Sequence, residues 1–295
     1  MQKSLSLRMF PPEMPTRQRI ELAADAGYQG VEVNLEPWQE FSLASGDAAL
    51  AGLRRIIEDN GLRVSAVYDR EQWHFPMSSA QPATRARCRA IIAGLARAAV
   101  LLGTDTVLVM PGAVDNSILA PQPEITPYDI AYRNAQATLH ELARTSAAEF
   151  DIYLAIENCP SKFLLSPLEF AHIIDEIGSP RVVAYFDIGN VLAYGYPEQW
   201  ITILGARPHG RIHRVHFKDT RVTRDGAPCA TPLLAGDVNW PAVMAALSAA
   251  GYDGWATAEV FPHYRYAGER LIYDTSSALD SLFSLLPTAS GRGGV

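Results

Sequence analysis

Four short segments of the chain each end an apolar run with a side chain that can bind a metal ion. The segments are LAIENCP (154–160), YFDIGN (185–190), HRVHFKDT (213–220) and ATAEVF (256–261), and the candidate ligands are Glu157, Asp187, His216 and Glu259. Clustered carboxylates in a partly dehydrated pocket repel one another, and a divalent cation removes that repulsion. One nitrogen and three hard oxygens suit Mn²⁺, Mg²⁺ or Co²⁺ better than a structural zinc. We therefore predict one divalent metal ion, Mn²⁺ first, with Mg²⁺, Co²⁺ or Zn²⁺ as alternatives.

The elements that must position these residues alternate between strand and helix. Short apolar or β-branched runs predict strands at 5–10, 31–35, 64–68, 106–112, 153–158, 182–189, 212–218 and 255–261. Apolar residues at helical spacing predict helices at 16–27, 47–61, 84–103, 128–150, 166–178, 197–205, 239–251 and 275–286. Eight strand and helix repeats favour a single (β/α)8 TIM barrel over 1–287, with a doubly wound sheet as the rival. The small and polar residues 288–295 predict a disordered tail.

Alternation along each strand places the candidate ligands inside this barrel. If Glu157 faces the lumen, Tyr153 and Ala155 do too, while Leu154 and Ile156 pack on helices. The same reading puts one metal-capable side chain inward near the C-terminal end of each of the last four strands. Barrel enzymes place their chemistry at that end, so we expect the four side chains to converge there.

Composition narrows the classes of function. The chain has 295 residues, 48% of them hydrophobic, and a net charge of −7, which offers no overall basic field for nucleic acid. Its three cysteines form no CxxC pair, and no signal-peptide or membrane-spanning apolar stretch is evident. These features predict a cytoplasmic protein that binds neither nucleic acid nor a membrane.

The same four segments resemble the metal-ligand segments of the xylose-isomerase-like TIM-barrel superfamily of sugar and sugar-phosphate isomerases and epimerases. DIGN together with HFKDT is most similar to the ketopentose-phosphate 3-epimerases. Free-ketose 3-epimerases and hydroxypyruvate isomerases usually carry histidine where this chain has Asn190. Endonuclease IV shares the fold but needs a trinuclear site with many more histidines than the seven present here.

The resemblance implies that Glu157, Asp187, His216 and Glu259 bind the metal and that Glu157 and Glu259 act as an acid/base pair. The implied substrate is a ketose or ketose phosphate that reacts through an enediolate, which a metal stabilises as a Lewis acid. Two alternatives stay open. One is a metal-dependent lyase or dehydratase acting on a keto-sugar, keto-inositol or 3-keto-glycoside, and the other is a non-catalytic sugar-binding barrel.

Further residues are candidates for contact with a small carbohydrate. Lys218 has inward parity and could bind a substrate oxygen or phosphate or form a salt bridge, and Asn158 and Asn190 could touch a hydroxyl or orient a ligand. The remaining candidates are Tyr68, Trp73 and His74 in the loop after the third strand and Arg8 near the first.

Three further features bear on specificity and assembly. Glu32 and Arg214 share inward parity and are expected to form an ion pair deeper in the lumen. Arg221 and Arg224 would attract a phosphate, whereas Asp237 would repel it, so the sequence leaves phosphorylation of the substrate open. The aromatic segment 195–201 is a candidate contact in a homo-oligomer, with internal packing as the alternative.

Overall fold

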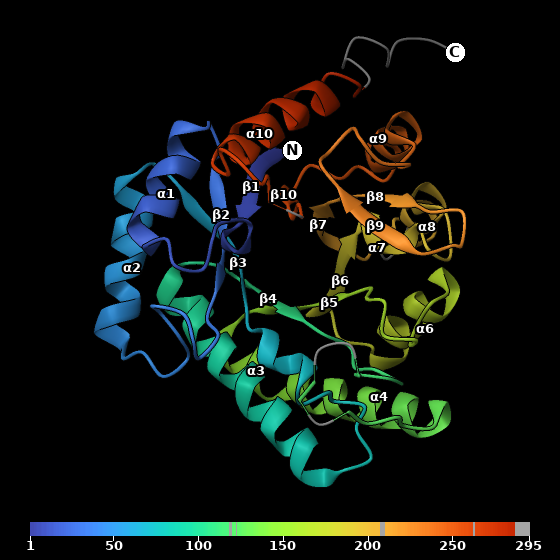
Figure 1. Cartoon of the computed structure of the whole chain (residues 1–295). Helices are drawn as coiled ribbons and strands as arrows, with labels where there is room; N and C mark the ends of the chain where they lie inside the picture. The colour runs from blue at the N-terminus through green and yellow to red at the C-terminus, as the bar shows by residue number, and fades with distance from the viewer. Residues whose placement is uncertain (118–119, 122, 207–209, 262, 287–295) are drawn as a thin grey trace, which may run out of the picture.

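Eight parallel strands close into a barrel in the computed structural model, and helices surround it (Figure 1). The structure describes residues 1–286 except 118–119, 122, 207–209 and 262. The predicted tail, 288–295, lies outside the described residues. The barrel strands are β1 (Gln2–Ser6), β2 (Gly30–Asn34), β3 (Arg63–Tyr68), β4 (Thr106–Val109), β5 (Tyr153–Glu157), β6 (Val182–Asp187), β7 (Ile212–Phe217) and β10 (Trp255–Ala258). The predicted (β/α)8 fold is thus confirmed.

The helices lie outside the strands, and their apolar faces form the larger core. They are α1 (Thr16–Asp25), α2 (Asp47–Asp59), α3 (Pro82–Leu102), α4 (Tyr128–Arg144), α5 (Ser146–Phe150), α6 (Pro167–Ile177), α7 (Ile188–Val191), α8 (Pro197–Leu204), α9 (Trp240–Ala249) and α10 (Arg270–Phe283). Gly103 and Gly178 follow α3 and α6 with positive φ, the left-handed conformation in which helices commonly end. Among the described residues, no helix combines the length and apolarity needed to span a membrane.

Two hydrophobic clusters divide the strand residues as predicted. Leu154, Ile156 and Phe217 belong to the large cluster between strands and helices. Ala155 and Tyr185 belong to a small cluster in the lumen. Side chains of one strand therefore alternate between the two cores, which fixes the direction in which the ligand residues point.

The predicted first strand, 5–10, is wrong in its bounds. Backbone pairing runs from Gln2 to Ser6, and Leu7–Met9 form a 3-10 turn, η1. The apolar run continues past the strand because Leu7 and Met9 stay buried in the large hydrophobic cluster. A second short turn, η2 (Arg70–Trp73), follows β3.

Other boundaries also differ from the predictions. The predicted helix at 128–150 is two helices divided at Thr145, and the last helix begins at Arg270 rather than near 275. The predicted strand at 182–189 ends at Asp187, whose side chain accepts a hydrogen bond from the Asn190 backbone N–H and so caps α7. The loop after β7 contains an antiparallel hairpin of β8 (Asp219–Val222) and β9 (Pro228–Thr231), and β8 contacts α7 (Figure 1).

Candidate metal centre

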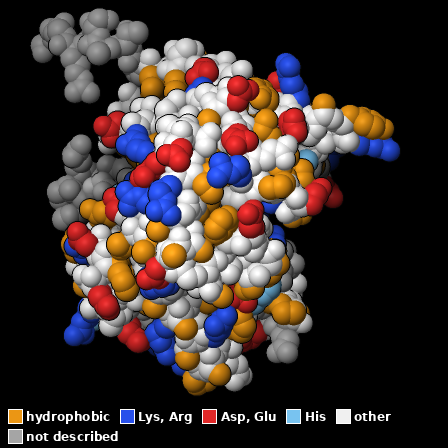
Figure 2. All heavy atoms as spheres, turned by 90° about the vertical axis from the view of Figure 1, so that its left-hand side faces the viewer, with side chains coloured by type: hydrophobic (Ala, Val, Ile, Leu, Met, Phe, Trp, Pro, Cys, Tyr) orange, Lys and Arg blue, Asp and Glu red, His pale blue; other side chains and the backbone are white. Residues whose placement is uncertain are grey.

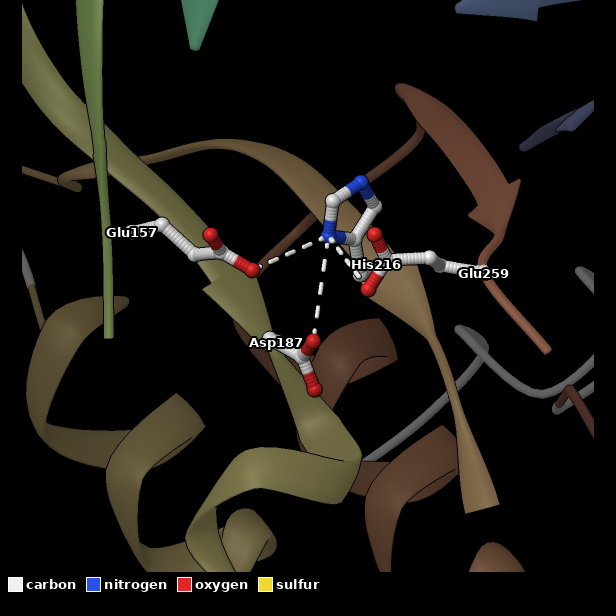
Figure 3. Close-up of side chains that lie close together, drawn as sticks. All are labelled: Glu157, Asp187, His216 and Glu259. Atoms are coloured by element: carbon white, nitrogen blue, oxygen red, sulfur yellow. Dashed lines mark hydrogen bonds and ion pairs between the residues drawn. The ribbon is translucent and has the colours of Figure 1, made fainter. Parts of the chain in front are cut away.

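Four neighbouring strands bring Glu157, Asp187, His216 and Glu259 together, as the sequence predicts. Glu157 and Asp187 end β5 and β6, His216 lies one residue before the end of β7, and Glu259 directly follows β10. One ligand atom from each lies within 4.8 Å of those of the other three, and all four residues are buried. Figure 3 shows Glu157 and Glu259 on opposite sides of the His216 ring, with Asp187 closing a third side.

The two ring nitrogens of His216 have different surroundings. Nδ1 lies 3.3 Å from Glu157 Oε1, 3.8 Å from Asp187 Oδ2 and 3.9 Å from Glu259 Oε2. Nε2 lies 3.1 Å from Glu32 Oε2 instead. A proton on Nε2, donated to Glu32, leaves the Nδ1 lone pair directed at the cluster. A carboxylate that holds a ligating histidine in this way is typical of protein metal sites.

Glu32 therefore has a different partner from the one expected. It also accepts a hydrogen bond of 2.7 Å from the Tyr185 hydroxyl, and it is fully buried. Arg214, the expected partner, pairs with Asp105 at 2.8 Å and donates to the Ser65 carbonyl oxygen. The predicted Glu32–Arg214 ion pair is wrong, because the lumen places the His216 ring beside Glu32.

Two cations neutralise the side of the cluster around Glu259. Arg8 Nη1 lies 2.9 Å from Glu259 Oε1, and Lys218 Nζ lies 3.0 Å from Glu259 Oε2 and 3.4 Å from Asp187 Oδ2. Burial alone would raise the pKa of Glu259, but Lys218, His216 and Arg8 together hold that pKa well below its usual range. Burial raises the pKa of Asp187, in keeping with a group that lacks full charge compensation.

The two asparagines hold the backbone and side chain of Asp187. Asn158 accepts from the Asp187 backbone N–H at 2.7 Å and donates to its carbonyl oxygen at 2.8 Å. Asn190 donates its side-chain N–H to the Asn158 carbonyl oxygen at 3.0 Å. These hydrogen bonds fit the orienting role that was one of the two possibilities for the asparagines. Substrate contact by either asparagine stays a prediction.

The glycine of the DIGN segment has a steric reason. A Cβ on Gly189 would lie 2.7 Å from Lys218 Cγ and 3.0 Å from the Lys218 carbonyl oxygen. Any larger residue would push the Lys218 side chain away from Asp187 and Glu259. The two segments DIGN and HFKDT therefore depend on each other through this close approach.

The aromatic candidates lie at two depths. Tyr68 is buried in the lumen, where the Arg8 guanidinium lies 5.8 Å from its ring, and Trp73 packs against the same lumen cluster. His74 lies further out, with its ring 6.4 Å from that of Trp38. Their contact with substrate stays a prediction.

The loop between β7 and α9 is tied down by a buried aspartate. Asp219 accepts hydrogen bonds from the backbone N–H groups of Gly236 and Val238 and from the Trp240 indole N–H. Asp237 accepts from the Val222 backbone N–H at 2.8 Å. Asp237, which the sequence linked to phosphate discrimination, thus closes the hairpin together with Gly236 in this structure.

The sequence reasoning missed Cys159, which lies beside the cluster, and Glu36, whose carboxylate interacts with Arg8. The Cys159 thiol lies 3.4 Å from Glu157 Oε2 and 3.6 Å from Met110 Sδ. Glu36 lies 1% exposed two residues beyond the end of β2. The sequence did indicate Glu36, because in NLEPW (34–38) an acidic residue directly follows an apolar one, as in the candidate ligand segments.

The donor set fits a divalent metal ion. The chain supplies one imidazole and three carboxylates, all buried and with ligand atoms within 4.8 Å of one another. Among the described residues, Arg8 and Lys218 are the arginine and lysine partners of these three buried carboxylates, so the cluster needs a further positive charge when His216 is neutral. A divalent ion held by Glu157, Asp187, His216 and Glu259 would supply that charge.

A closed parallel barrel with carboxylate and imidazole donors at its C-terminal end is typical of one class of protein, the metal-binding TIM barrels. Within that class, the chain belongs to the xylose isomerase-like TIM barrel family, whose model matches residues 20–282. The resemblance predicted from the four segments is thus confirmed.

Individual relatives narrow the comparison. The chain is 24% identical over 249 residues to a protein named putative L-ribulose-5-phosphate 3-epimerase SgbU of Escherichia coli (strain K12), covering 80% of each chain. Its fold is similar to that of an L-ribulose 3-epimerase, with a TM-score of 0.75, 19% identity and coverage of 100% of this chain and 99% of the other. It is also similar to the IOLI protein solved with a bound zinc atom, with a TM-score of 0.80, 16% identity and coverage of 98% and 100%.

Proposed function

We propose that the protein is a divalent-metal-dependent epimerase or isomerase of a ketose or ketose phosphate, with Glu157 and Glu259 as its acid/base pair. The observation that carries the proposal is the position of these two carboxylates on opposite sides of the His216 Nδ1 atom (Figure 3). A substrate carbon between them would meet one carboxylate on each face. Removal of a proton on one side and its return on the other inverts that carbon.

The names of the relatives agree with this chemistry. The curated relative is named for L-ribulose 5-phosphate, and the structural neighbour for L-ribulose. Both names describe 3-epimerisation of a ketose, with and without a phosphate. These names support the reaction class. The substrate of this chain depends on its own residues.

The surroundings of the two glutamates differ in a way that suits opposite roles. Arg8 and Lys218 both pair with Glu259 and favour its anionic form. Among the described residues, Glu157 has no lysine or arginine in ion-pair contact, and it lies beside the Cys159 thiol and His216. We therefore assign the first proton abstraction to Glu259 and the return of a proton on the other face to Glu157.

A bound divalent ion, with Mn²⁺ as our first expectation, would stabilise the negative charge that develops on the ketone oxygen when the neighbouring proton leaves. Lys218 and Arg8 would stay beside Glu259 and limit its movement. The apolar side chains of Tyr68 and Trp73 would restrict water on the inner side of the substrate.

The test is solvent exchange. The protein is stripped with a chelator, reloaded with Mn²⁺, and incubated with L-ribulose or L-ribulose 5-phosphate in deuterium oxide. We expect deuterium at one carbon of the recovered sugar and formation of its epimer or isomer, both lost in Glu157→Gln and in the chelated protein. Loss of water without an isomeric sugar would indicate the lyase alternative, and binding without exchange would indicate the non-catalytic barrel.

A further inference from the structure

A small pocket adjoins the metal centre at the ends of β1, β2 and β10. Its volume is about 220 Å³, and its lining includes Arg8, Glu36, Trp38, Arg70 and Phe261. This is smaller than the roughly 300–1,000 Å³ of pockets for drug-sized ligands, so it suits a small molecule or one end of it. Arg8 lines the pocket and also contacts the metal centre, because its Nη1 atom lies 2.9 Å from Glu259 Oε1. A substrate reacting at the metal centre could therefore extend into this pocket.

Glu36 is the unusual group in the lining. Val31, Val33 and Leu35 pack in the outer core, whereas Glu32 faces the lumen, so Glu36 continues the inward parity of β2 beyond its end. Its side chain is 1% exposed, and its Oε2 atom has no hydrogen-bond partner among the described residues. Burial raises the pKa of this carboxyl, while the Arg8 and Arg70 guanidinium groups and the Arg70 backbone N–H favour its charged form. A buried acceptor without a partner is unfavourable unless a ligand donates to it. A sugar hydroxyl is such a donor.

The arginines that line the pocket, Arg8, Arg19 and Arg70, already have partners within the protein. Arg8 is paired with Glu259, and the Arg19 guanidinium donates to the carbonyl oxygens of Pro12 and Met14, each at 2.7 Å. Arg70 lies over the Trp38 ring, 5.4 Å from its centroid. A phosphate placed here would meet the Glu36 carboxylate. Arg8 and Arg70 already interact with that carboxylate, so the phosphate would have to compete for them.

We propose that this pocket receives the hydroxyl-bearing far end of an unphosphorylated ketose, with Glu36 accepting a hydrogen bond from a substrate hydroxyl. The Trp38 ring supplies an apolar wall of the kind against which the C–H face of a sugar packs. Glu36 is thus a specificity-determining residue that selects against a terminal phosphate. This inference rests on the proposed function, because it concerns the other end of the same substrate.

The experiment measures binding of two matched pairs, L-ribulose with L-ribulose 5-phosphate and D-fructose with D-fructose 6-phosphate. Calorimetric titrations compare Mn²⁺-loaded wild type with Glu36→Gln, and the exposed Glu149→Gln, far from the pocket lining, serves as the matched control. We expect wild type to bind the free member of at least one pair more tightly. In Glu36→Gln, the ratio of free to phosphorylated affinity should fall by about tenfold or more, because a hydrogen bond to a charged acceptor is lost and repulsion of the phosphate is removed. The control should leave this ratio unchanged.

Several outcomes would overturn the inference. Tighter binding of the phosphate esters by wild type, reduced in Arg70→Gln, would make the pocket a phosphate site. A changed thermal unfolding midpoint in Glu36→Gln with an unchanged affinity ratio would leave Glu36 a structural role only. Failure of both members of both pairs to bind would also reject it.

The measurements distinguish a failure of this inference from a failure of the proposed function. If the phosphate ester exchanges deuterium with solvent in wild type, the reaction stands while the pocket assignment fails. If free ketoses bind through Glu36 but no exchange occurs with any of the four sugars, the pocket assignment stands while the reaction fails.

Discussion

His216 Nε2 lies 3.1 Å from Glu32 Oε2, while the Nδ1 atom of the same ring faces the three carboxylates of the cluster. The second strand thereby fixes the orientation of a candidate metal ligand carried by the seventh strand, β7. Tyr185 adds a hydrogen bond to Glu32 and so links the sixth strand to the same arrangement.

Glu32→Gln should weaken Mn²⁺ binding about 10- to 100-fold, as is typical when a partner of a ligating histidine is changed. The amide can donate to Nε2 and so favour the tautomer with its proton on Nδ1. Calorimetric titration of the chelated protein checks this, with the exposed Glu21→Gln as control. Tyr185→Phe should have a smaller effect of the same sign, and unchanged affinity in Glu32→Gln would contradict the assigned role.

Gly189→Ala should destabilise the fold by about 1–3 kcal/mol, because the new methyl group would overlap Lys218 Cγ. Exchange of substrate deuterium should fall as well, since Lys218 would leave Glu259. Gly52→Ala is the matched control, because its nearest neighbour is Arg55 Nη2 at 4.0 Å and alanine favours the helix interior by roughly 0.5–1 kcal/mol. Urea unfolding of both variants should therefore give changes of opposite sign.

Gly236→Ala should release the hairpin from the barrel. A Cβ there would lie 2.0 Å from Asp219 Oδ1, so the aspartate cannot keep its bonds to the loop. Arg221 and Arg224 are exposed on this segment, and trypsin should cut there faster than in wild type. Gly46→Ala, where a Cβ meets no atom within 4 Å, should leave the cutting rate unchanged. Equal rates in both variants would show that the aspartate does not secure the loop.

Asp69 should make stability fall between about pH 4 and pH 7. Burial raises the pKa of its carboxyl to about 7, with further contributions from neighbouring Glu36 and Glu71 opposed by Arg87. The unfolded chain loses this proton near pH 4, so the folded form is favoured below that pH and loses up to about 1.4 kcal/mol per pH unit above it. The loss is complete once the pH exceeds the folded pKa.

Asp69→Asn can still accept from the Glu71 backbone N–H, the bond that caps η2. Its unfolding free energy should therefore depend less on pH over this range than that of wild type, while the exposed Asp59→Asn should follow wild type. If the unfolding free energies of wild type and Asp69→Asn changed with pH in the same way, Asp69 would not be the group responsible.

The barrel and its four candidate ligands could be predicted because both depend on local sequence patterns. The alternation around Glu157 fixes which side chains face the lumen, and chain order places successive strands side by side. The partner of Glu32 could not be predicted, since the choice between Arg214 and His216 depends on the stagger between strands. A register shift between Ala184 and Tyr185 is part of that stagger. The turn at Leu7–Met9 was missed because burial in a turn and burial in a strand give the same apolar run.

The hairpin after β7 is anchored at its base and free at its tip. Asp219 holds the base through three hydrogen bonds to the returning chain, while residues 224–227 at the tip are exposed. Insertions or replacements at the tip should therefore leave His216 in place. The hairpin behaves as an exchangeable module, through which protein engineering could alter the rim of the active site without redesigning the barrel.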